Sequence, residues 1–130
     1  MKSPWKILSA LLIATVLVSK LMPNPWKMAV MDRWHGPIDM SLAAHLLMFA
    51  LTAFSITHAV TTPRAWKILG SALALSVATE ALQFFAIERH PSLQGVVTEM
   101  TGAFFGWGLA AVHLRLARRW RSGTANPAQK

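Results

Sequence analysis

Four long apolar segments, separated by short polar stretches, dominate the pattern of this chain. Each is close to the ~20 residues that a helix needs to cross about 30 Å of hydrocarbon. Helices of a soluble domain would carry a polar face, whereas these segments are apolar on nearly every side. The pattern predicts an all-α membrane protein with four transmembrane helices, over residues 5–22, 41–60, 66–87 and 96–116.

A single domain accounts for these segments. It takes in residues 1–121, and the sequence has no internal repeat that would indicate a second unit. The remaining residues, 122–130, include Gly, Thr, Asn, Pro and Gln, a composition typical of disorder. We therefore expect one four-helix transmembrane domain followed by a disordered cytoplasmic tail.

The first segment has some features of a secretory signal peptide, since Lys2 and Lys6 precede its apolar stretch. Such peptides are cleaved after a small-x-small pattern, which the Lys-Leu-Met-Pro sequence at residues 20–23 lacks. Proline cannot continue a helix without breaking its hydrogen bonds. We therefore expect an uncleaved helix that ends before Pro23 and Pro25.

Lysine and arginine are distributed unevenly between the two sides of the membrane. The amino terminus, the loop after Val60 and the tail together carry nine of these residues. The other two loops carry four, namely Lys20, Lys27, Arg33 and Arg89. Cytoplasmic segments of membrane proteins carry the excess of positive charge, so the bias predicts that both termini lie in the cytoplasm.

Composition excludes several classes of site. The chain has no cysteine, so disulfides and thiolate metal sites are impossible. Its net charge of +8 largely flanks apolar segments, and no separate basic helix indicates a nucleic-acid partner. We expect membrane lipids as partners, no nucleic acid and no cofactor.

Glu80 is the most unusual residue, because its carboxylate lies inside the third apolar segment. A carboxylate at the bilayer centre costs roughly 2.5–3.5 kcal/mol on insertion scales, so it needs a partner or a function. At ~1.5 Å per residue, Glu80 and Gln83 lie roughly 10 and 6 Å below the outer end of their segment. His45 and Glu99 lie roughly 6 and 5 Å below the outer ends of theirs. Three helices therefore bring polar side chains to similar levels in the outer half of the bilayer.

Small residues in the fourth segment indicate close helix packing. Gly102 and Gly106 form a GxxxG step, and small residues let helix backbones approach in lipid. We expect the third and fourth segments to pack through these glycines, with a homodimer through the same glycine face as the alternative. His58 and His113 lie near the inner ends of their segments, where we expect them to be interfacial or hydrogen-bonded.

The polar group admits several interpretations. Glu80 is either a hydrogen-bonding group between helices or part of a site for a polar head group, a proton or a cation, with Arg89 and His90 at its mouth. His45, Glu80 and Glu99 are also chemically suitable ligands for a divalent metal. No HxxxH or HExxH pattern supports that reading, so we expect no metal. Ser92 lacks a nucleophile elbow and an evident base, which argues against serine catalysis.

Three short motifs follow one another in the carboxyl half. They are Glu-Ala-Leu-Gln-Phe at 80–84, Arg-His-Pro-Ser-Leu at 89–93 and Gly-Ala-Phe-Phe-Gly at 102–106. In their order and spacing they resemble the VanZ-like family of small bacterial membrane proteins, over about residues 41–109. The residues that fit the family pattern are Glu80, Gln83, Arg89, Ser92, Gly102 and Gly106.

Other positions depart from the family pattern. Gly95 stands where the family has an Asp, and Glu99 stands where it has an Asn. An earlier Asp-Lys-x-x-His motif survives only as His45, with Ser41 and Leu42 at its first two positions. One interpretation is that the carboxylate has moved one helical turn along the chain, from position 95 to position 99.

The resemblance implies a four-helix, multi-pass protein of the bacterial cytoplasmic (inner) membrane, with its motif on the extracytoplasmic side. The family takes its name from a protein that gives low-level resistance to the glycopeptide teicoplanin. Most members have no assigned reaction. The resemblance therefore points towards the cell envelope and antibiotic tolerance without naming a chemistry.

Three functions remain open at this point. The first is binding of a lipid, a lipid-linked cell-wall precursor or a glycopeptide. Arg89 would offer its planar fork to a phosphate or carboxylate, and the polar floor would consist of His45, Glu80, Gln83 and Glu99. Ser92 is a further candidate ligand-binding residue. The second is an intramembrane enzyme with Glu80 or His45 as general base. The third is a transport or structural subunit. We favour binding over catalysis.

Overall fold

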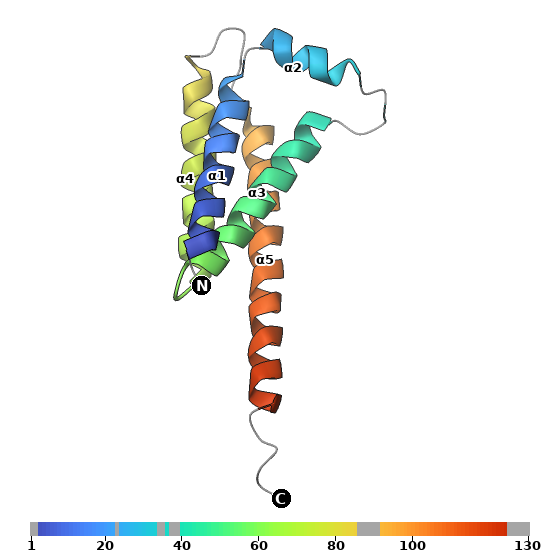
Figure 1. Ribbon diagram of the computed structural model, residues 1–130. Coiled ribbons are helices and arrows are strands. Elements are labelled where there is room, and N and C mark those ends of the chain that lie inside the picture. The colour runs from blue at the N-terminus through green and yellow to red at the C-terminus, as the bar shows by residue number, and fades with distance from the viewer. Residues whose placement is uncertain (1–2, 23, 34–35, 37–39, 86–91, 125–130) are drawn as a thin grey trace, which may run out of the picture.

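Five helices make up the described part of the computed structural model, and four of them form a bundle (Figure 1). The helices are α1 (Ser3–Leu21), α2 (Asn24–Met31), α3 (Met40–Ala59), α4 (Ala65–Gln83) and α5 (Leu93–Thr124). The structure describes residues 3–22, 24–33, 36, 40–85 and 92–124.

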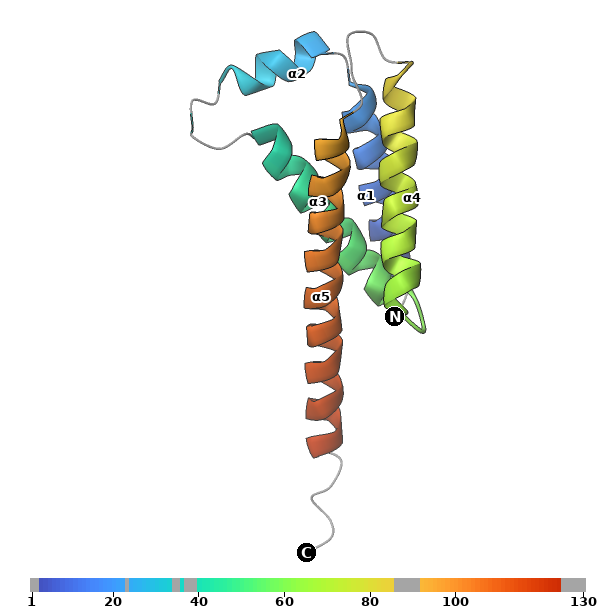
Figure 2. The same ribbon diagram turned by 180° about the vertical axis from the view of Figure 1, so that it is seen from behind.

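The predicted all-α architecture is confirmed, because α1, α3, α4 and α5 are each long and apolar enough to cross a membrane. α3 runs obliquely across the bundle and packs chiefly against α5 and α1 (Figures 1 and 2).

α2 was not predicted. It is eight residues long, too short to span, and it lies across one end of the bundle between α1 and α3 (Figure 1). Its exposed Trp26 and Met28 suit a helix at a membrane interface.

α4 ends earlier than the sequence pattern predicts. The helix stops at Gln83, and the amides of Phe84 and Phe85 bond to carbonyls three residues back, at 3.2 and 3.1 Å. This tighter turn is a common way to finish an α-helix. The predicted third span ran to residue 87, and its last two residues lie outside the described part.

α5 is longer than predicted at both ends. Ser92 caps its amino terminus, since the Ser92 hydroxyl accepts a hydrogen bond from the Gly95 amide at 3.1 Å. The helix then continues for 32 residues, about 48 Å, and projects beyond the other three (Figure 1). Residues 122–124, predicted as part of a disordered tail, belong to this helix. The basic residues near its end favour the helix, because cations stabilise a helix carboxyl terminus.

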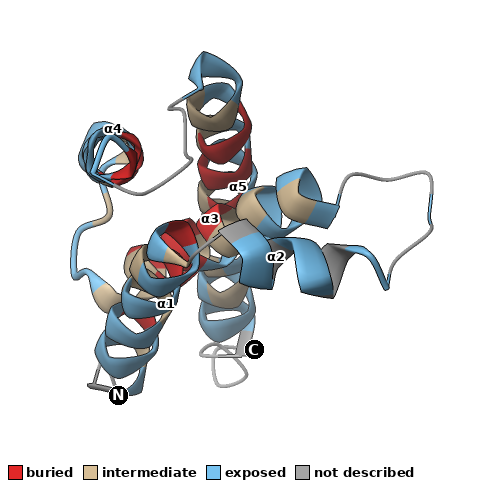
Figure 3. Ribbon diagram, turned by 90° about the horizontal axis from the view of Figure 1, so that it is seen from above, coloured by how far each residue is buried: buried red, intermediate tan, exposed pale blue. Residues whose placement is uncertain are grey.

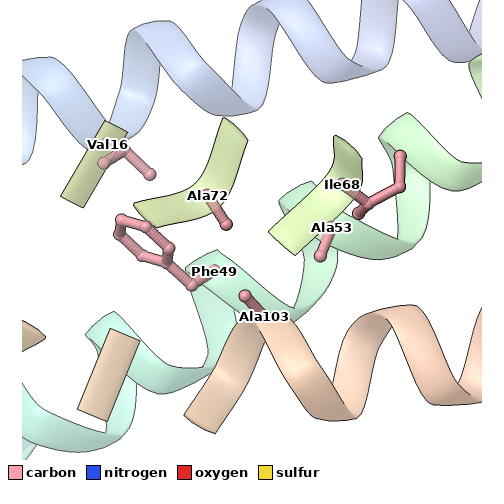
Figure 4. Packing of buried hydrophobic residues seen from close by; sticks show 6 residues of the cluster. All are labelled: Val16, Phe49, Ala53, Ile68, Ala72 and Ala103. Atoms are coloured by element: carbon pink, nitrogen blue, oxygen red, sulfur yellow. The ribbon is translucent and has the colours of Figure 1, made fainter. Parts of the chain in front are cut away.

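The core is small and lies where the four long helices meet (Figure 4). Seen from above, the buried positions face inward and the exposed ones face outward on every helix of the bundle (Figure 3). Many exposed side chains are large and apolar, including Leu11, Val18 and Leu109, as expected of a surface in contact with acyl chains. The core consists of Val16, Phe49, Ala53, Ile68, Ala72 and Ala103.

Small and polar residues bring α3 close to its neighbours. The hydroxyls of Ser9 on α1 and Ser55 on α3 are hydrogen-bonded at 2.9 Å in the buried interface. On the other side of α3, a Cβ atom at Gly102 would collide with the Leu46 carbonyl, and one at Gly106 with the Ala50 carbonyl. These two glycines therefore allow direct contact between backbones.

The role of Gly102 and Gly106 in helix packing is therefore confirmed, but the predicted partner was wrong. Both glycines pack against α3, the second span, and not against α4, the third. The reason is the oblique course of α3, which places its backbone along the glycine face of α5 (Figure 2). This face is occupied within the single chain, and a homodimer through it remains a prediction.

Candidate functional site

Lys20 lies at the centre of a buried group of polar side chains at one end of the bundle. Its side chain is only 2% exposed. Its ammonium Nζ donates to Glu80 Oε1 on α4 at 2.6 Å and also pairs with Glu99 Oε1 on α5. One lysine from α1 thus joins two carboxylates from two other helices.

The Glu80 carboxylate is held from two sides. Lys20 contacts its Oε1, and its Oε2 accepts a hydrogen bond from the backbone amide of Ser92 at 3.0 Å. Gly95 makes room for it, because a Cβ atom at that position would lie 2.8 Å from Glu80 Oε1. Glu80 therefore also fastens the beginning of α5 to the end of α4.

Glu99 is fully buried and connects four helices. Its Oε2 accepts a hydrogen bond from the Ser76 hydroxyl of α4 at 2.5 Å. Its Oε1 lies between the Lys20 ammonium and Nδ1 of His45, which is 3.2 Å away on α3. Both nitrogen atoms lie within ion-pair distance of this oxygen. We define the polar cluster as Lys20, His45, Ser76, Glu80 and Glu99.

The cluster brings together most of the site residues that the sequence predicts. His45, Glu80 and Glu99 are members of it, and Ser92 contacts it through its backbone. Gln83 is 5% exposed and lies on α4, three residues beyond Glu80. Arg89 lies outside the described residues, so its predicted place at the mouth of the site stays a prediction.

The sequence analysis missed two members of the cluster, Ser76 and Lys20. Lys20 was counted among the loop charges on the outer side, whereas it is buried and paired. Two signals were present in the sequence. Lys20 lies inside the predicted span 5–22, and it carries a positive charge on the side where the positive-inside rule disfavours one. Without Lys20, three basic residues remain in the loops predicted to lie outside, and the orientation stays a prediction.

The charges of the cluster nearly cancel. Two carboxylates face one lysine ammonium and one imidazole. With His45 protonated the four groups sum to zero, and with His45 neutral they carry one negative charge. Removing charges from water costs several kcal/mol per ion, which an ion pair offsets only if its geometry is good. The ammonium, the imidazole and the two carboxylates can therefore be buried only because they lie close together and offset one another's charge.

A half-open cavity of about 400 Å³ adjoins the cluster between α1 and α3. Its walls are mainly apolar and include Val16 and Phe49, which point towards one another in Figure 4. Lys20 and His45 also line it, so its polar part is continuous with the cluster. Ligand sites in proteins are commonly apolar cavities of 300–1,000 Å³ with a few polar groups.

The opposite end of the bundle holds two histidines that do not belong to this cluster. His58 Nε2 lies 3.0 Å from His113 Nδ1, and His58 Nδ1 lies 2.9 Å from the Phe54 carbonyl. Because a carbonyl only accepts, the bond to Phe54 requires a proton on His58 Nδ1. The Trp5 ring stacks on His58 at 4.7 Å. The expectation that these histidines are hydrogen-bonded is confirmed.

Within the described residues, no three His, Asp or Glu side chains are arranged to hold a metal ion. Comparison with protein-family models, with curated proteins and with solved structures finds no match for this chain. The chain is a multi-pass membrane protein by the length and composition of its helices.

Proposed function

We propose that this chain is a VanZ-like protein of the bacterial cell envelope that binds an amphiphilic molecule at its polar cluster. The candidate ligands are a membrane lipid, a lipid-linked cell-wall precursor and a glycopeptide. The observation that carries the proposal is Lys20, buried between Glu80 and Glu99 and lining an apolar cavity. Such an arrangement offers an apolar compartment and polar contacts side by side, as an amphiphile requires.

A purely structural role accounts less well for the cluster. Replacing a buried ion pair by apolar residues is often neutral or stabilising, so ion pairs are not needed to hold a bundle together. Ionisable residues inside a membrane are rare and usually mark a functional pathway or site. The cluster also lies beside the cavity and not in the small core of the bundle. These three points support a ligand-binding role.

The proposal also accounts for the two positions that depart from the family pattern, Gly95 and Glu99. Gly95 replaces the family's Asp, and it gives Glu80 the space that a larger residue would occupy. Glu99 replaces the family's Asn, and it supplies the carboxylate that meets Lys20 and His45. The two departures are thus linked, and together they agree with a carboxylate that has moved by one helical turn.

Arg89 remains part of the proposal as a ligand for phosphate or carboxylate. It precedes Ser92 by three residues, and the Ser92 amide is bonded to Glu80. In the sequence, Arg89 is therefore three residues from a backbone group that contacts the cluster. Arginine is suited to such a role because its planar fork binds these groups through two parallel hydrogen bonds.

Intramembrane catalysis is the second candidate function, and one contact favours it. The Glu99 carboxylate lies 3.2 Å from Nδ1 of His45, which would leave Nε2 as the ring nitrogen able to take a proton. A carboxylate in that position orients an imidazole as a general base. His45→Gln separates the two functions. If His45 is the base, this substitution would abolish turnover of a bound lipid. If His45 is not the base, the substitution would alter binding alone.

Native mass spectrometry of the protein extracted with its lipids tests the binding function. The decisive variant is the triple substitution Lys20→Met, Glu80→Gln and Glu99→Gln, which removes the lysine ammonium and both of the carboxylates that it contacts. Lys67→Met is the control, because Lys67 is exposed on α4. We expect a lipid or precursor that co-purifies with wild type and with the control, and that is lost from the folded triple variant. Equal retention of that molecule by the triple variant would contradict the proposal.

A further inference from the structure

We propose that the cavity between α1 and α3 holds the single hydrocarbon chain of an amphiphile whose head group is an uncharged hydroxyl. Long-chain alcohols and monoacylglycerols are the chemical class. This inference rests on the proposed binding function and deepens it, because it names the site of the chain and the chemistry of the head group.

The volume and lining of the cavity carry the first part of the inference. Its volume of about 400 Å³ is near the lower end of the range for ligand sites. Val16 from α1, with Met48 and Phe49 from α3, supplies apolar surface. Its polar lining is confined to a few side chains of the same two helices, among them Lys20 and His45. A small apolar cavity with a polar margin suits one chain and a small head group.

The hydrogen bonds already made around the cavity carry the second part. The Thr15 hydroxyl donates to the Leu11 carbonyl at 2.8 Å, and the Ser19 hydroxyl donates to the Val16 carbonyl at 2.8 Å. Lys20 is engaged by two carboxylates. The oxygens of Thr15 and Ser19 can still accept, so these groups favour a head group that can donate a hydrogen bond.

The net charge of the cluster argues against the two ionic alternatives, an anionic head group and an ammonium head group. The cluster balances its own charges when His45 is protonated and carries one negative charge when His45 is neutral. No described group of the cluster would therefore compensate the negative charge of an anionic head group in either state, and an ammonium head group would lie beside Lys20. A hydroxyl leaves the net charge of the cluster unchanged in both protonation states of His45. It donates to His45 Nε2 when the imidazole is neutral and accepts from it when the imidazole is protonated.

Photolabelling with a defined set of C12 compounds tests this assignment. The probe is a dodecanol with a diazirine in mid-chain, added to the purified protein in lipid nanodiscs. The competitors are dodecanol, dodecyl methyl ether, dodecylamine and dodecanoate. We expect crosslinks on α1 and α3 at residues that line the cavity, and we expect dodecanol to compete at least tenfold better than the other three. Equal competition by the ether would contradict the assignment of a hydroxyl head group. Better competition by the amine or the acid would contradict the assignment of an uncharged head group.

Two substitutions test the location. Met48→Trp places a large ring in the cavity, whereas Leu47→Trp, its neighbour on α3, adds the same ring at an exposed position. We expect Met48→Trp to lose the crosslinks and Leu47→Trp to keep them. Ala44→Phe at another lining position serves if Met48→Trp does not fold. If crosslinks persist in a folded variant whose cavity is filled by the introduced ring, the cavity is not the binding site.

The outcomes also separate this inference from the proposed function. A co-purifying molecule with a charged head group, lost in the triple variant, would support binding at the cluster and refute the hydroxyl. Specific dodecanol labelling without any co-purifying molecule would support the cavity and contradict binding of an envelope molecule at the cluster.

Discussion

Lys20 and Glu80 are 60 residues apart in the chain, and their side chains meet at 2.6 Å in the interior of the bundle. The pair joins the end of α1 to the end of α4, which have few other contacts with each other. Because Glu99 contacts the same ammonium, the three residues behave as one electrostatic unit. Several consequences of this unit and of the glycine contacts can be measured.

Removing Lys20 alone should be strongly destabilising. Lys20→Met leaves two carboxylates buried without their cation, and breaking a buried ion pair in this way costs about 3–5 kcal/mol. Adding Glu80→Gln and Glu99→Gln should recover most of that loss, because no buried carboxylate is then left without its cation. Unfolding in detergent measures both effects, with Lys67→Met as the exposed control. A single variant as stable as the triple variant would mean that the three residues are not coupled.

Gly106 should tolerate no side chain. Gly106→Ala directs a Cβ atom into the Ala50 carbonyl of α3, so the two helices must separate. Overpacking of this kind costs about 1–3 kcal/mol. Gly108→Ala is the matched control on the same helix, since its Cβ meets nothing within 4 Å. Thermal unfolding of the two variants in detergent should separate them clearly. If they unfold at the same temperature, α3 and α5 are not in backbone contact.

Gly95 should be required for the position of Glu80. Gly95→Ala brings a Cβ atom to 2.8 Å from Glu80 Oε1, and this oxygen is already fixed by Lys20. We expect a loss of about 1–3 kcal/mol in unfolding free energy, typical of a crowded interior. Gly70→Ala in α4 has open space and should instead stabilise by roughly 0.5–1 kcal/mol, because alanine favours a helix. A gain in both variants would show that Glu80 moves aside without cost.

Both termini should lie in the cytoplasm. The motive is the excess of Lys and Arg at the two ends and in the loop after Val60. The chain has no cysteine, so single cysteines can be introduced without background labelling. In spheroplasts, a membrane-impermeant maleimide should label Asp32→Cys directly and Ser122→Cys only after permeabilisation. The reverse pattern would invert the topology and place the polar cluster on the cytoplasmic side.

Much of this molecule follows from the sequence by local physical rules. The length of each apolar run predicts the four long helices, since a run of about 20 residues is what hydrocarbon of about 30 Å requires. The depth of His45, Glu80 and Glu99 within their runs predicts that they lie at one level. GxxxG spacing predicts that Gly102 and Gly106 face another helix. None of these inferences needs a knowledge of how the helices cross.

Only the tertiary structure decides which residues meet. Lys20 was counted among the loop charges, yet the packing of α1 turns its long side chain inward to Glu80 and Glu99. The oblique course of α3 decides that the glycines of α5 face Leu46 and Ala50 rather than α4. Partner choice depends on the rotation and crossing of helices that are far apart in the chain. Hydrophobic periodicity is a local property, and in a nearly uniformly apolar helix it leaves that rotation undetermined.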